Sequence, residues 1–110
     1  MRVGSDKAPI ACSLTTLELR DREAKLLVQF RSAVIEIEEI HDGYAFHLPG
    51  ENKWIRLVME LIVAERECCP FLTFEVAALL NMGPVIVRVT GPAGTKEFLR
   101  ALLYKSEESM

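Results

Sequence analysis

Residues 71 to 91 read FLTFEVAALLNMGPVIVRVTG, and the two halves of this stretch match each other across the turn NMGP. Pairing Glu75 with Arg88 places opposite charges side by side, and the same register pairs Thr73 with Thr90 on the same face. The other face is then entirely apolar: Phe74, Val76, Val87 and Val89. This agreement predicts an antiparallel β-hairpin with one face turned toward a core.

The segment before this hairpin, KWIRLVMELIVAEREC at residues 53 to 68, is apolar around most of its circumference and predicts a helix. Pro70 ends that helix, because a residue followed by proline disfavours the α conformation. At about 100° per residue, Glu65, Cys68 and Cys69 fall on the helix's buried arc. The apolar members of that arc are Trp54, Leu57, Val58, Leu61 and Ile62.

Residues 33 to 40, AVIEIEEI, alternate between apolar and acidic side chains, as in a half-buried strand. The dipeptide Asp42-Gly43 predicts a two-residue turn into a second strand, in a register that sets Ile37 opposite Leu48. The inward face of this first hairpin is then Ile35, Ile37, Phe46 and Leu48.

Two further helices flank these elements. Thr15 and Glu18 form a capping box, which predicts a helix from about residue 16 to 31. Its shared apolar face is Leu17, Ala24, Leu27 and Val28, and the polar residues that cover the rest are Arg20, Asp21, Glu23 and Lys25. Residues 91 to 103 predict a closing helix whose inward residues are Phe98, Ala101 and Leu102.

The predicted order is α-β-β-α-β-β-α, two ββα units after an N-terminal helix. It indicates an α+β two-layer sandwich, in which helices cover mainly one face of a four-stranded antiparallel sheet. We expect one domain over residues 1 to 110, with flexible ends at 1 to 11 and 105 to 110. The opposite sheet face carries more apolar residues than solvent exposure requires, which favours a homodimer. These residues are Val34, Ile40, Leu79 and Ile86.

Composition narrows the function classes. The chain has 110 residues, half of them hydrophobic, which suffices for one core. Its net charge is −3 and its cations alternate with acids, a pattern that argues against nucleic acid as a partner. Arg56, Glu60 and Glu65 interrupt the longest apolar stretch, so we expect no membrane span. The start lacks a secretory signal and the cysteine count of three is odd, so we expect a cytoplasmic protein with reduced thiols.

An inward Glu65 needs a partner, because a buried carboxylate is costly unless it is protonated, paired with a cation or bound to a metal. One interpretation is an ion pair that only fixes the packing, with Arg20, Arg31 or Arg66 as the cation. The other is that Glu65 shares a site with the two thiols three and four residues later on the same face.

Cys68 and Cys69 have four interpretations. They could be small side chains that only pack in the core, a vicinal disulfide, a reactive thiolate or metal ligands. Adjacent Cα atoms are about 3.8 Å apart and strain a disulfide, while a helix C-terminus with nearby acids opposes an activated thiolate. A cation fits the same charges, so the sequence predicts zinc or a heavier thiophilic ion. Cys12 would add a third sulfur if the chain before the first helix folds back over Pro70.

Three stretches together resemble a group of small bacterial proteins of uncharacterised function. They are IACSL at residues 10 to 14, ERECCPFLTF at 65 to 74 and VTGPAGTKEFL at 89 to 99. The resemblance extends over roughly residues 10 to 103. It implies that Cys12, Cys68 and Cys69 are the cysteines of the family, with Glu65 in the same motif, and that some relatives accompany heavy-metal resistance functions.

Two hypotheses follow. In the first, a small cytoplasmic protein binds a thiophilic ion through Cys12, Cys68, Cys69 and Glu65, without catalysis. In the second, a dimerisation or protein-interaction module uses the outward sheet face, and its cysteines only pack. An enzyme with Glu65 as general acid is a third, weaker alternative, because a carboxyl with a raised pKa suits that role.

Overall fold

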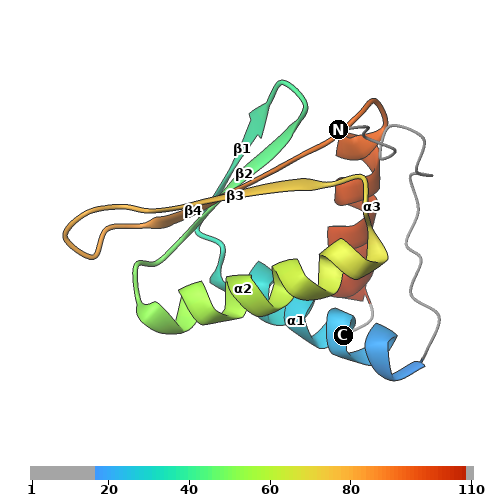
Figure 1. The fold of residues 1–110 in the computed structure, drawn as a ribbon, viewed down its shortest axis with the longest axis horizontal. Coiled ribbons are helices and arrows are strands. Elements are labelled where there is room, and N and C mark those ends of the chain that lie inside the picture. The colour runs from blue at the N-terminus through green and yellow to red at the C-terminus, as the bar shows by residue number, and fades with distance from the viewer. Residues whose placement is uncertain (1–16, 109–110) are drawn as a thin grey trace, which may run out of the picture.

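The predicted order of elements and the α+β class are confirmed. A computed structural model describes residues 17 to 108, in which an open four-stranded antiparallel sheet has the strand order β1-β2-β4-β3 (Figure 1). The helices are α1 (Leu17–Ala33), α2 (Asn52–Cys68) and α3 (Thr95–Glu108). The strands are β1 (Glu36–Ile40), β2 (Gly43–Leu48), β3 (Thr73–Ala78) and β4 (Val85–Thr90). The last helix takes in the start of the tail that we expected to be flexible.

The three helices pack on one side of the sheet (Figure 1). The core lies between them and the two central strands, β2 and β4, whose inward residues are buried. Those strand residues are Phe46, Leu48, Val85, Val87 and Val89, and they contact Leu26, Leu27, Phe30, Leu57, Val58, Leu61 and Leu99 of the helices. Among residues 17 to 108, no helix is long and apolar enough to cross a membrane.

The register of the second hairpin is confirmed. Glu75 pairs with Arg88 and Thr73 with Thr90, as the side-chain matching predicts. The apolar face also points inward, although Val76 stays partly exposed because β3 is an edge strand. Local complementarity across this hairpin was therefore sufficient to fix its pairing.

The register of the first hairpin differs from the prediction by two residues. Ile37 pairs with Phe46 instead of Leu48, and the turn falls on His41 and Asp42. Gly43 belongs to β2, where it pairs with Thr90 of β4, and a Cβ at this position would collide with the carbonyl oxygen of Val89. The glycine therefore permits close approach of β4 rather than forming the turn. A shift of two preserves the faces, so the predicted inward set is retained.

The predicted apolar face of α1 is wrong in part: Leu27 is buried and Val28 is half-buried, but the other two members are exposed. Leu17 is 71% exposed and Ala24 is exposed. The buried positions follow a spacing of three and four residues: Glu23, Leu26, Leu27, Phe30 and Ala33. The rotation of α1 follows from its largest apolar side chain, Phe30, whose ring packs edge-on against Phe46 at a centroid distance of 5.3 Å. It also turns a carboxylate, Glu23, toward the interior.

Candidate metal centre

The end of α2 positions the two cysteines and Glu65 as the sequence predicts. Cys69 has left the helical conformation, with φ −127° and ψ 76°, while its N–H still donates to the carbonyl oxygen of Glu65. The proline at position 70 favours this extended geometry. As a result, the side chains of Cys68 and Cys69 both remain beside the inward face of the last helical turn. The prediction that Glu65, Cys68 and Cys69 point inward is confirmed.

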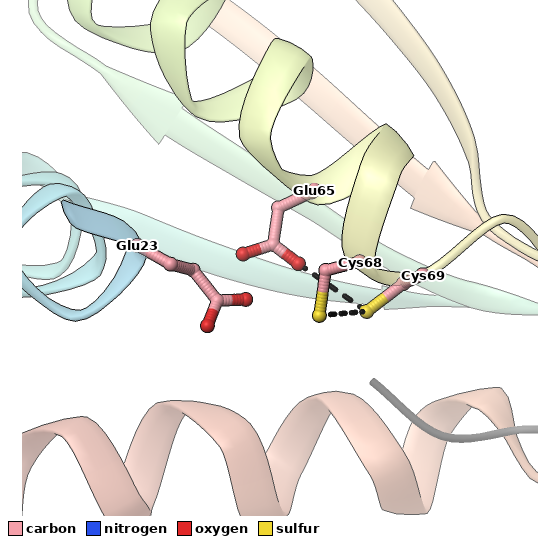
Figure 2. A group of neighbouring side chains, drawn as sticks. All are labelled: Glu23, Glu65, Cys68 and Cys69. Carbon is pink, nitrogen blue, oxygen red and sulfur yellow. Dashed lines mark hydrogen bonds between the residues drawn. The ribbon is translucent and has the colours of Figure 1, made fainter. Parts of the chain in front are cut away.

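A fourth side chain, Glu23 of α1, completes the group (Figure 2). Each of the four residues offers one ligand atom, and these atoms lie within 4.8 Å of one another. All four are enclosed, with Glu23 8% exposed, Glu65 3%, and both cysteines 0%. Two helices that are distant in sequence therefore bring two carboxyl groups and two sulfur atoms to one place.

Glu23 was not predicted as a site residue, because the sequence pattern indicated that it lies on the solvent side of α1. The usable signal was its spacing, because Leu26, Leu27 and Phe30 follow it by three, four and seven residues. A carboxylate at a position of the buried helix face is unusual, and the same feature identified Glu65 on α2.

Hydrogen bonds within the group are incomplete. The Cys69 sulfur lies 3.4 Å from Glu65 Oε1 and 3.4 Å from Cys68 Sγ, and its single S–H hydrogen serves these two acceptors. Within residues 17 to 108, Oε2 of Glu23 and Oε2 of Glu65 are buried without a hydrogen-bond partner. Buried carboxyl oxygens of this kind carry a desolvation cost that an additional ligand would relieve.

Burial dominates the acid–base chemistry. It raises the pKa of Glu65 from 4.5 to about 9, the adjacent Glu23 carboxyl adds to the increase, and the hydrogen bond from Cys69 opposes it. Burial likewise raises the pKa of Cys69 far above the usual range of a thiol, and the charges of Glu65 and Glu23 act in the same direction. Glu65 and Cys69 therefore both hold their protons at neutral pH, which argues against a nucleophilic thiolate.

Glu65 has no arginine partner among residues 17 to 108. Arg20, Arg31 and Arg66 are not among the groups that act on it, and no cation lowers its pKa. The polar neighbours that act on Glu65 are Glu23 and Cys69. Neither of these neighbours carries a positive charge. The charge that would balance an ionised Glu65 could therefore come from a bound metal cation.

Aromatic side chains close the sulfur side of the group. Cys68 and Cys69 form a small buried cluster with Phe71, and Leu72 and Phe98 pack against it. The rings of Phe71 and Phe98 meet edge to face at 5.1 Å. These apolar walls exclude water, so an ion bound here would exchange its hydration shell for protein ligands.

The two described cysteines differ in oxidation state. Cys68 is disulfide-bonded, whereas Cys69 is a free thiol, so the expectation of reduced thiols is wrong for Cys68. Because the thiolate is the form that binds metals, Cys68 becomes a ligand only when it is reduced. The third predicted sulfur, Cys12, lies outside the described residues, and its role stays a prediction.

The geometry is close to that of a mononuclear site. Bonds from zinc to sulfur and to oxygen are about 2.3 and 2.1 Å, so tetrahedral ligand atoms lie about 3.4 to 3.8 Å apart. The four ligand atoms lie within 4.8 Å of one another, so metal binding would require these side chains to move closer together.

Comparison with known proteins adds no assignment. No protein-family profile, curated protein or solved structure matches this chain. The resemblance to a group of small bacterial proteins therefore stays a prediction, and the function must be argued from the site itself.

Proposed function

We propose that the protein binds one thiophilic metal ion through Glu23, Glu65, Cys68 and Cys69, with Cys12 as a further predicted sulfur ligand. The observation that supports this most directly is that four buried residues place one ligand atom each within 4.8 Å of one another. Among the described residues, the Glu23 and Glu65 carboxyl groups also each have a buried oxygen without a hydrogen-bond partner. A cation would satisfy those oxygens and offset the cost of burial that now keeps Glu65 protonated.

The ligand set favours zinc or a heavier ion that likewise accepts both sulfur and oxygen ligands. Thiolates select soft and borderline ions, and carboxylates accept borderline and hard ones, so a mixed set suits zinc better than copper(I). The enclosure of the four side chains favours ion binding over catalysis on a larger substrate. The proposed role is metal storage, delivery or sensing in a reducing compartment such as the cytoplasm.

The binding-competent form has Cys68 as a thiol. A phosphine reductant supplies the two electrons for this change. One water molecule is consumed: its oxygen joins the phosphine to form the phosphine oxide, and its two protons complete the two thiols formed from the disulfide. Metal binding then displaces the protons that Glu65 and Cys69 hold at neutral pH. The proposal therefore predicts metal uptake that depends on reductant and is accompanied by proton release.

The test is a calorimetric titration of the phosphine-treated protein with zinc, followed by desalting and elemental analysis. One ion per chain is expected for the unmodified protein. Glu65→Gln and Cys69→Ser should each weaken binding by at least about tenfold, since one lost ligand costs about 1.4 kcal/mol or more. The matched control is Glu60→Gln, which alters an exposed glutamate of the same helix. Absence of retained zinc in the reduced protein would overturn the proposal.

A second candidate is a homodimer or protein-interaction module that uses the sheet face opposite the helices. That face has a hollow of about 420 Å³ in which Ala45, Ala77 and Ile86 lie among charged residues. Exposed Leu79, Leu80 and Met82 continue the apolar surface at the β3–β4 turn. Ile86→Asp should then abolish concentration-dependent association in sedimentation experiments, and a protein that is monomeric at all concentrations would exclude the dimer.

A further inference from the structure

A second cavity lies away from the cysteines, between the end of α1, strands β1 and β2, and α3. Its volume is about 460 Å³, which is within the range of small-molecule sites. The lining combines apolar walls with a few polar groups, and the residues that matter are Phe30, Arg31, Ile37, Tyr44, Phe46 and Arg100. None of these residues belongs to the candidate metal centre.

The apolar wall is exposed because β1 is an edge strand that the helices leave uncovered. Ile35 is 65% exposed and Ile37 is 54% exposed, although both belong to the inward face of the sheet. Behind them the ring of Phe46 packs against Tyr44, with centroids 6.2 Å apart. Apolar side chains that line a concave surface of this kind favour the body of an organic ligand.

The polar side of the cavity carries charged side chains. Among the described residues that line it, these are Arg31 of α1, Glu36 of β1 and Arg100 of α3. Arg100 Nη2 donates a hydrogen bond to Tyr44 Oη at 2.8 Å, which orients the guanidinium while its other N–H donors remain for a ligand. A second acid of β1, Glu39, is engaged by Lys96 at 2.7 Å. Glu39 and Glu97 also act electrostatically on Arg100, so the cavity offers an anion the remaining N–H donors of that guanidinium and not a net positive charge.

We propose that this cavity binds a small amphipathic carboxylate. Its apolar body would pack on Ile35, Ile37 and Phe46, and its carboxylate would accept hydrogen bonds from the guanidinium of Arg100. Arginine favours this chemistry because its planar N–H groups match the two oxygens of a carboxylate.

A second copy of the chain is the less suitable occupant of this edge. Strand β1 carries Glu36, Glu38 and Glu39, so antiparallel pairing of two β1 strands would bring like charges together. Acidic side chains on an edge strand are a common way to prevent such pairing. The concave shape and the remaining N–H donors of Arg100 instead fit a small anion.

The test measures binding of decanoate by calorimetry or by chemical-shift changes, with neutral 1-decanol as the matched probe. Decanoate should saturate one site per chain, and 1-decanol should bind at least about tenfold more weakly, because it lacks the charge-assisted hydrogen bonds. Arg100→Gln should weaken the binding of decanoate by a similar factor without changing the binding of 1-decanol. The control is Arg88→Gln, which alters an exposed arginine on the opposite sheet face.

Three results would overturn the inference: no saturable decanoate binding, equal affinity for the two probes, or unchanged decanoate affinity in the Arg100 variant. Ile37→Ser gives a second check. It should weaken the binding of both probes, because it removes apolar surface from the wall of the cavity. Because Arg100 and Ile37 are both exposed, neither substitution disturbs the core, and circular dichroism verifies that each variant is folded. The metal proposal is independent of each outcome.

Discussion

Replacement of Glu65 by glutamine should stabilise the metal-free protein at neutral pH while it removes metal binding. In the folded protein the pKa of Glu65 is about 9, against an ordinary value of 4.5. At pH 7 the carboxyl is therefore protonated when folded and ionised when unfolded. The separation of about 2.5 pH units between 4.5 and 7 corresponds to a loss of about 3 kcal/mol in unfolding free energy.

The sign of this effect follows from the raised pKa. The stabilising contribution of the protonated carboxyl is fully present below pH 4.5 and is lost as the pH rises toward 9. Glutamine keeps an oxygen that accepts the Cys69 hydrogen bond but does not ionise, so Glu65→Gln should lack this pH dependence.

Urea unfolding at several pH values, with chelator and phosphine present, measures the difference. The wild-type free energy should fall by up to about 1.4 kcal/mol per pH unit relative to Glu65→Gln between pH 5 and 8. Glu60→Gln serves as the control and should follow the wild type. Parallel pH profiles for wild type and Glu65→Gln would refute the claim that Glu65 titrates from a buried, acid-lined position.

Three further predictions concern the fold and the free thiol. Gly43→Ala should destabilise the protein by more than about 1 kcal/mol in urea, because the added Cβ meets the β4 backbone at Val89; a neutral effect would contradict that contact. Leu48→Ala, at a fully buried position of β2, should cost about 2 to 5 kcal/mol, and a loss well below 1 kcal/mol would show a less packed core. Without reductant, iodoacetamide should modify the buried Cys69 thiol at least about tenfold more slowly in the native protein than in urea, as followed by mass spectrometry; equal rates would contradict its burial.

The sequence correctly predicted the elements whose geometry is determined by residues close to them in the chain. The second hairpin is fixed by charge and hydroxyl pairs that face each other across one turn, and these pairs occur as predicted. The buried face of α2 follows from its helical spacing, which carried Glu65 into the interior. Three of the four residues of the candidate metal centre had been singled out as site residues from the sequence for this reason.

The features that sequence reasoning missed depend on contacts between distant elements. The rotation of α1 is fixed by Phe30 against Phe46 of β2, and this contact brings Glu23 to the site. The register of the first hairpin reflects the approach of β4 to Gly43, which the hairpin's own residues do not reveal. In both cases, tertiary packing outweighed a plausible local pattern.

The X-ray absorption spectrum at the zinc edge, recorded on reduced protein loaded with one equivalent of zinc, tests the central claim most directly. The account predicts a mixed first shell in which at least two sulfur atoms at about 2.3 Å accompany oxygen ligands at about 2.1 Å. Cys69→Ser should remove one sulfur from that shell. A shell of only oxygen and nitrogen, as for zinc on surface carboxylates, would contradict the metal centre.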